Sequence, residues 1–104
     1  MTSDTGATIV VLATFRAGYE AHFAEYSARV RALLDARGAR VIRRQRVETT
    51  LYGEGTASLV MVIDLPTRAV AERMFFEPEY LAIIPLRDRV FEAFEMYLAA
   101  PGEI

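Results

Sequence analysis

The hydrophobic residues of this 104-residue chain fall into segments that predict four strands and two helical regions. Residues 8–15 and 59–65 are almost continuously apolar, which is typical of strands that are covered on both faces. Residues 40–51 mix charged with β-branched side chains and predict a strand at a sheet edge with at least one exposed face. Apolar and polar side chains alternate along residues 90–98, which predicts the last strand.

The first helix is predicted to start at Tyr19. Large apolar residues recur there at helical spacing; they are Phe23, Tyr26, Val30, Leu33 and Leu34. Arg37 and Gly38 follow, and a basic last turn with a glycine commonly ends a helix.

Two prolines, Pro78 and Pro85, interrupt the second helical region. A helix that begins with Thr67 as its cap should weaken at Glu77, because the residue before a proline is disfavoured in the α region. Pro78 can then begin a new turn, and Pro85 interrupts that turn again. We expect the short pieces to wrap around the end of the sheet and to form a lid made of Phe75, Phe76, Tyr80 and Ile84.

The order of elements predicts an α+β, ferredoxin-like βαββαβ fold with one four-stranded antiparallel sheet and both helical regions on one face. The two strands that are apolar on both faces then need a cover on the open face, and a second copy around a twofold axis supplies it. We therefore expect a homodimer in the form of a dimeric α+β barrel. Residues 8–99 should form the single domain, with tails at 1–7 and 100–104.

The segments "VIDLPTRAVAERMF" (Val62 to Phe75) and "FEPEYLAIIPLR" (Phe76 to Arg87) resemble the family called domain of unknown function 1330, which belongs to the dimeric α+β barrel superfamily. "GYEAHFAEYSARVRALLDARGARV" (Gly18 to Val41) is similar to the first helix of that family. The resemblance implies the fold and the dimer, but it brings no established catalytic residues. Where the family usually has Ser before Pro-Glu-Tyr, this chain has Glu77. The wider superfamily includes cofactor-free monooxygenases, haem-degrading enzymes, chlorite dismutases, muconolactone isomerases and polyketide cyclases, and the fold does not choose among them.

The composition excludes several kinds of chemistry. The chain has no Cys and one His, and its twelve basic residues are all Arg. Disulfides, thiolate nucleophiles, lysine Schiff bases and Cys/His zinc sites are therefore excluded. We expect no metal and no cofactor.

The charge pattern and the length of the apolar segments exclude two kinds of partner. A net charge of −2 and a pI near 5.4 argue against nucleic acid, although arginines gather in residues 37–46. A solvated edge strand explains that run better, although one of its arginines could still bind a carboxylate substrate. No apolar segment approaches the ~20 residues of a membrane span, and the amino-terminal residues lack the pattern of a secretory signal, so a cytoplasmic location is expected.

His22 is the candidate catalytic residue, because it lies at the border of the apolar stripe of the first helix between Tyr19 and Tyr26. One interpretation is a general base near neutral pKa, with the two phenols orienting a substrate. The other is a half-exposed surface histidine. The candidate substrate-binding residues are Phe15, Phe75, Tyr80 and Arg87; the guanidinium could bind a carboxylate, or it could instead form a structural salt bridge.

Three hypotheses about function remain open. The first is a cofactor-independent enzyme that acts on a small, partly apolar metabolite by proton transfer, isomerisation, cyclisation or monooxygenation, with His22 as base. The second is a non-catalytic dimer that binds a small ligand or assists a partner enzyme. The third is a haem protein with His22 as axial ligand.

Overall fold

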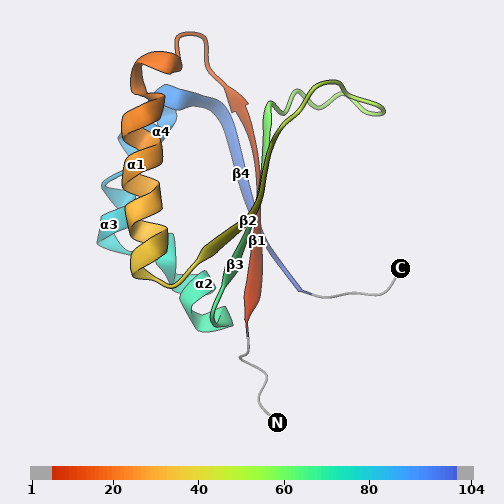
Figure 1. Cartoon of the computed structure of the whole chain (residues 1–104). Helices are drawn as coiled ribbons and strands as arrows, with labels where there is room; N and C mark the ends of the chain where they lie inside the picture. Colours follow the sequence, from red (N-terminus) through yellow and green to blue (C-terminus); the bar gives the residue numbers. More distant parts are fainter. Residues whose placement is uncertain (1–5, 101–104) are drawn as a thin grey trace.

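A computed structural model describes residues 6–100 of the chain. The elements are β1 (Ala7–Phe15), α1 (Glu20–Ala36), β2 (Arg40–Arg46), β3 (Leu59–Leu65), α2 (Arg68–Met74), α3 (Pro78–Leu81), α4 (Ile84–Val90) and β4 (Phe91–Ala99). The strands form one antiparallel sheet in the order β2-β3-β1-β4. All four helices lie on one side of this sheet (Figure 1). The α+β, ferredoxin-like fold is thus confirmed, whereas most of the two expected tails lies outside the described residues.

The helix-facing side of the sheet carries the core. On β1 the residues Ile9, Val11 and Ala13 are buried beneath the helices, while the residues between them face the other way. On β3 the residues Ile63 and Leu65 continue the same layer. This alternation is what a pleated strand imposes, because successive side chains point to opposite faces.

The opposite face of the sheet has an apolar centre. Val10 pairs with Val62 and Leu12 pairs with Val60 in the register of β1 and β3, and all four side chains are half-buried in the single chain. We call these four residues the open-face patch. Both central strands are therefore apolar on both faces, as the sequence pattern predicts.

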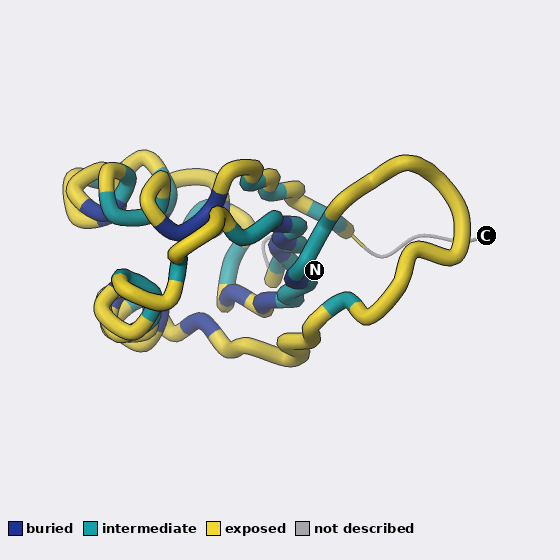
Figure 2. The backbone as a smooth tube through the Cα atoms, turned by 90° about the horizontal axis from the view of Figure 1, so that it is seen from above, coloured by how far each residue is buried: buried dark blue, intermediate teal, exposed yellow. Residues whose placement is uncertain are grey.

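The β2 strand ends at Arg46, five residues before the expected end. Residues 47–58 form an exposed arm that extends beyond the sheet (Figures 1 and 2). At its base the Val47 amide donates to the Ser58 carbonyl at 2.8 Å, and farther out the Thr50 hydroxyl donates to the Gly55 carbonyl at 3.2 Å. The arm lacks a neighbouring strand and a packed apolar face, so its β-branched residues do not form a regular ladder.

The broken helical region is confirmed in its main features. The Thr67 hydroxyl accepts from the Val70 amide at 3.1 Å and caps α2, and Glu77 is extended just before Pro78 begins α3. Pro85 lies in the first turn of α4, so it begins a helix and does not end one. The expected lid is only partly correct, because the Phe76 side chain is 77% exposed.

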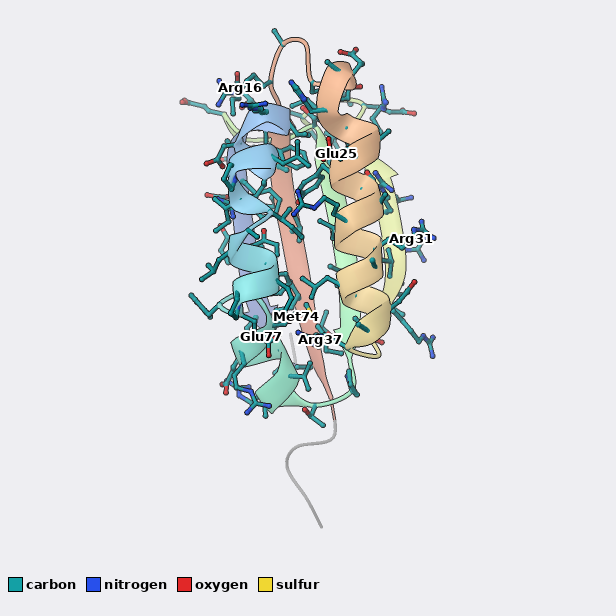
Figure 3. The ribbon with its side chains drawn as sticks, turned by 90° about the vertical axis from the view of Figure 1, so that its left-hand side faces the viewer. Arg16, Glu25, Arg31, Arg37, Met74 and Glu77 are labelled. Carbon is teal, nitrogen blue, oxygen red and sulfur yellow. The ribbon has the colours of Figure 1, made fainter. Side chains whose placement is uncertain are left out.

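An ion pair fixes the end of α1 to the start of α3. Arg37 approaches one carboxylate oxygen of Glu77 with Nε at 2.8 Å and Nη2 at 2.7 Å (Figure 3). The Glu79 carboxylate lies 3.6 Å from the same Nη2. Both Arg37 and Glu77 are mostly shielded from water, with side chains 24% and 33% exposed. Glu77 therefore has a structural partner in Arg37.

Glu77→Gln should lower the free energy of unfolding by about 1 kcal/mol, because it removes the charge from a partly shielded, hydrogen-bonded pair. Urea unfolding measures the change, and 1 M NaCl should reduce it. Glu72→Gln is the control, since Glu72 pairs with Arg68 at 3.0 Å but both side chains are about half exposed. Equal losses for the two variants would contradict a special role for the Arg37–Glu77 pair.

Candidate functional site

A cavity of about 620 Å³ lies between α1 and the helix-facing side of the sheet. Its volume is in the range of small-molecule sites. Aromatic and aliphatic side chains make up much of its lining, among them Phe23 from α1, Met61 from β3, and Phe91 and Phe94 from β4. The Phe91 and Phe94 rings lie 5.2 Å apart. The cavity therefore offers an apolar, aromatic surface to a ligand.

A second cavity, of about 460 Å³, lies beside the first, nearer the amino-terminal end of α1. The two cavities share Phe23, Arg44 and Leu59 as lining residues. Phe15 and Tyr19 line the second cavity and stack on each other at 4.0 Å between ring centroids. The two hollows are thus neighbouring parts of one groove between α1 and β2.

Tyr26 is the buried polar side chain of the larger cavity. It is 8% exposed, and its ring packs edge-on against Phe91 at 5.5 Å. Burial raises the pKa of Tyr26 well above its ordinary value, and the neighbouring Tyr80 raises it further; the positive charges of Arg87 and Arg44 oppose this shift without cancelling it. The hydroxyl is therefore a neutral hydrogen-bonding group throughout the physiological range.

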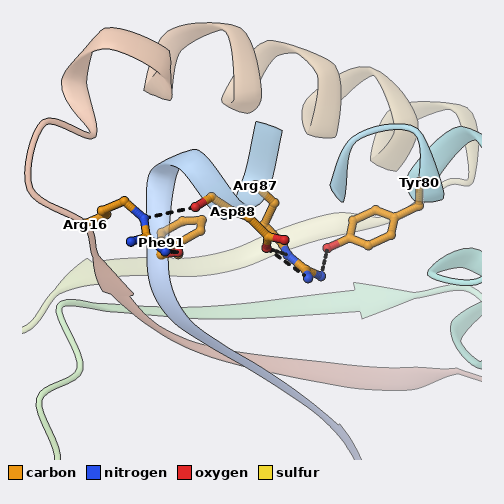
Figure 4. A network of polar contacts seen from close by, with 5 residues as sticks. All are labelled: Arg16, Tyr80, Arg87, Asp88 and Phe91. Carbon is orange, nitrogen blue, oxygen red and sulfur yellow. Dashed lines mark hydrogen bonds and ion pairs between the residues drawn. The ribbon is translucent and has the colours of Figure 1, made fainter. Parts of the chain in front are cut away.

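Tyr80 and Arg87 lie behind Tyr26. The Nη1 group of Arg87 donates to the Tyr80 hydroxyl at 3.3 Å, and its Nη2 lies 3.3 Å from the Asp88 carboxylate (Figure 4). The guanidinium also lies over the Phe94 ring, 4.9 Å from its centroid. Burial disfavours the charge, but the contacts with Tyr80 and Asp88 outweigh it and raise the pKa of Arg87. Arg87 thus remains a cation that is held in place by its neighbours.

The structure brings together Tyr26, Tyr80 and Arg87, but Tyr80 and Arg87 do not line either cavity. Phe75 packs edge-on against Tyr80 at 5.0 Å but does not line either cavity. His22 is half-buried and also does not line either cavity. Its catalytic role stays a prediction.

Arg44 is a residue of the site that the sequence pattern did not single out from the other arginines of residues 37–46. It lines both cavities, and its guanidinium lies 5.2 Å from the centroid of the Phe23 ring. Its face is set by a register shift between Val41 and Arg43, after which Arg44 pairs with Met61 on the helix-facing side of the sheet. Simple alternation from Arg40 would place it on the opposite face. An irregularity of this kind leaves no clear signal in a short, charged strand.

Two kinds of function can be checked against the described part of the chain. Within residues 6–100, no group of three or more His, Asp and Glu side chains is arranged to hold a metal ion. In the same residues, no helix is both long and apolar enough to cross a membrane.

This geometry defines a class of protein. It is a ferredoxin-like α+β protein with a cavity between its first helix and its sheet. The family model described as "Domain of unknown function (DUF1330)" matches residues 8–100, and the chain belongs to this family. Among curated proteins no sequence matches it.

Solved structures share the fold at low sequence identity. A protein of unknown function from Rhodopseudomonas palustris superimposes with a TM-score of 0.81 at 17% identity, covering 98% of this chain and 88% of that one. SnoaB, a cofactor-independent oxygenase from Streptomyces nogalater, gives 0.67 at 17% identity and 96% coverage of both chains. A dimeric protein of unknown function with a ferredoxin-like fold from Bacteroides fragilis gives 0.59 at 12% identity, covering 90% and 94%. These likenesses show the fold alone.

The buried phenol predicts a stability change at alkaline pH. Above pH ~10 the unfolded chain ionises Tyr26, whereas the folded chain keeps the proton because its pKa is raised. The unfolded state then binds fewer protons, so this contribution to stability is complete below that pH and is lost as pH rises. Tyr26→Phe removes the effect.

Urea unfolding at pH 8 and pH 10.8 tests this prediction. At pH 8 Tyr26→Phe should be less stable than the wild type by ~0.5–1.5 kcal/mol, because it loses a buried polar contact. At pH 10.8 the difference should shrink. Tyr52→Phe is the control, because the Tyr52 side chain on the arm is 98% exposed. This variant should have the same free energy of unfolding as the wild type at both pH values. A difference between wild type and Tyr26→Phe that does not change with pH would contradict the assignment.

Proposed function

We propose that the chain forms a homodimer that binds a small, partly apolar metabolite between α1 and the sheet, and acts on it without a cofactor. The reaction is a proton transfer, an isomerisation, a cyclisation or a monooxygenation. The observation that carries this proposal is the neutral, buried Tyr26 side chain in the wall of an aromatic cavity, with the Tyr80–Arg87 pair next to it. The similar fold of a cofactor-independent oxygenase supports it.

These four reactions share a first step in which the substrate loses a proton and becomes an anion with its charge on oxygen. A fixed phenol that donates to this oxygen stabilises the transition state more than the ground state. The apolar part of the lining strengthens the interaction, because an apolar environment screens charge less than water does. For a monooxygenation, O₂ is the oxidant: a substrate CH₂ becomes a carbonyl, and the second oxygen atom leaves as water.

His22 is the residue that we propose as the base. It lies one helical turn before Tyr26 and is the chain's single imidazole. Because it does not line either cavity, its side chain has to turn toward the groove when a substrate binds. The same observation favours the second candidate function, a dimer that binds a ligand without catalysis. No observation favours haem, because an axial His22 would also have to open into a cavity.

Hydrogen exchange of 2-tetralone in D₂O tests the shared first step. This aromatic ketone exchanges the proton next to its carbonyl through an enolate, and proton NMR follows the rate. The wild type should accelerate exchange with saturation. Tyr26→Phe should lower the turnover by roughly 10², and His22→Gln by roughly 10² to 10⁴.

The exposed Tyr52→Phe variant is the matched control and should exchange at the wild-type rate. If 2-tetralone binds but its exchange is not accelerated, the non-catalytic function is the correct one. If Tyr26→Phe is impaired and His22→Gln is not, the cavity is catalytic but the base is another group.

The homodimer is tested through the open-face patch. Light scattering should give about twice 11.7 kDa for the wild type, and the interface should bury at least the ~1,200–2,000 Å² of a specific complex. Val62→Asp places a charge in the centre of the patch and should produce monomers. Leu81→Asp, on the helical side with a half-exposed side chain, should remain dimeric. A monomeric wild type would refute the proposed assembly.

A further inference from the structure

The rim of the larger cavity is positively charged although the chain as a whole is acidic. Its lining includes four arginines but a single acidic residue, Asp35; the arginines are Arg31, Arg40, Arg43 and Arg44. The net charge of the whole chain is −2. Positive charge is therefore concentrated at the one place where the proposed function needs a ligand.

These arginines have no anionic partner in the described part of the chain. The ion pairs there join Arg37, Arg68 and Arg87 to carboxylates, and none involves the four rim arginines or Asp35. Arg44 contacts the face of the Phe23 ring and forms no ion pair within residues 6–100, so its N–H edge can donate to a ligand. A guanidinium of this kind can bind an added anion without first breaking an ion pair.

The charges come from both walls of the cavity. Arg31 belongs to α1, on the side of the helix that faces β2 (Figure 3), and Arg44 belongs to β2. In the register of the sheet, Arg44 pairs with Met61 on the helix-facing side, whereas Arg40 pairs with Asp64 on the open side. Arg31 and Arg44 therefore approach the same space from opposite directions.

Protection of a sheet edge explains only part of this pattern. Arginines on an edge strand discourage pairing with other chains, and Arg40 and Arg43 fit that role because they lie on the open side. Edge protection does not explain why Arg31, which is on a helix, or Arg44, which faces the cavity, is an arginine. The positions of these two arginines need another explanation.

We propose that the ligand of the cavity is an organic anion, with a carboxylate-like group bound by Arg44 and Arg31 and an aromatic or similarly apolar body that packs on Phe91, Phe94 and Met61. Guanidinium groups suit such an anion because their planar N–H edges match its two oxygens. The apolar body then lies beside Tyr26. This inference rests on the proposed function, since it assigns the ligand class of the same site.

Two fluorescent probes that differ in one group separate the anion from the apolar body. 1-Anilinonaphthalene-8-sulfonate carries an anion, and N-phenyl-1-naphthylamine has the same rings without it. In 20 mM NaCl the wild type should bind the sulfonate roughly tenfold more tightly than the neutral probe. Arg44→Gln and Arg31→Gln should each lower the affinity for the sulfonate by roughly fivefold to tenfold. The affinity for the neutral probe should stay unchanged.

Arg29→Gln is the matched control, because Arg29 lies on α1, is exposed and does not line either cavity. It removes the same charge and should leave the sulfonate affinity unchanged. A tryptophan reporter places the probe, since the chain has no Trp of its own. Phe23→Trp in the cavity wall should transfer energy to the bound sulfonate more efficiently than Tyr52→Trp on the arm.

The outcomes distinguish the inference from the proposed function. If both probes bind near Phe23→Trp with equal affinity, and Arg44→Gln and Arg31→Gln have no effect, the anionic ligand class is wrong and the cavity remains a binding site. If Arg29→Gln lowers the affinity for the sulfonate as much as Arg44→Gln does, general surface charge is responsible for the binding and the inference is overturned. If neither probe binds, the proposed site fails as well. Urea unfolding of each variant confirms that the fold is intact.

Discussion

The rest of the structure depends on one constraint: the two central strands of the sheet, β1 and β3, are apolar on both faces. Ile9 and Ile63 point to one side, and Val10 and Val62 point to the other. Each face must be covered, because the transfer of apolar surface from water is the main driving force for folding. The four helices cover the first face. A second copy with the same patch is the cover that we propose for the other.

The broken helical region follows from the way the first face is covered. A buried phenol such as Tyr26 needs polar neighbours, because a hydroxyl without a partner in an apolar environment is costly. The pieces α3 and α4 supply them: Tyr80 and Arg87 meet through a hydrogen bond across seven residues. Pro78 and Pro85 begin these pieces and set their directions. The prolines therefore help to position the polar neighbours of Tyr26.

The sequence predicts those features that depend on local periodicity and local chemistry. The strand pattern, the first helix, the Thr67 cap and the extended Glu77 are of this kind, and the structure confirms them. The early end of β2 depends on whether neighbouring strands extend beside the arm, and the exposure of Phe76 depends on where α3 turns. A helical wheel places His22 at a border, but it cannot show which neighbours cover that border. Long-range packing decides all three.

Arg44 and Arg87 show how neighbours give one residue type two roles. Arg87 contacts Tyr80, Asp88 and the Phe94 ring, so its hydrogen-bonding capacity supports the buried phenol and is not available to a ligand. Arg44 faces the cavity because the register shift near Val41 turns it inward, and within residues 6–100 it meets no carboxylate. An unpaired cation beside an apolar surface favours an anion with an apolar body. The sequence pattern leaves the anion-binding role open between Arg87 and the arginines of residues 37–46, and the contacts in the fold favour Arg44, the residue that we propose.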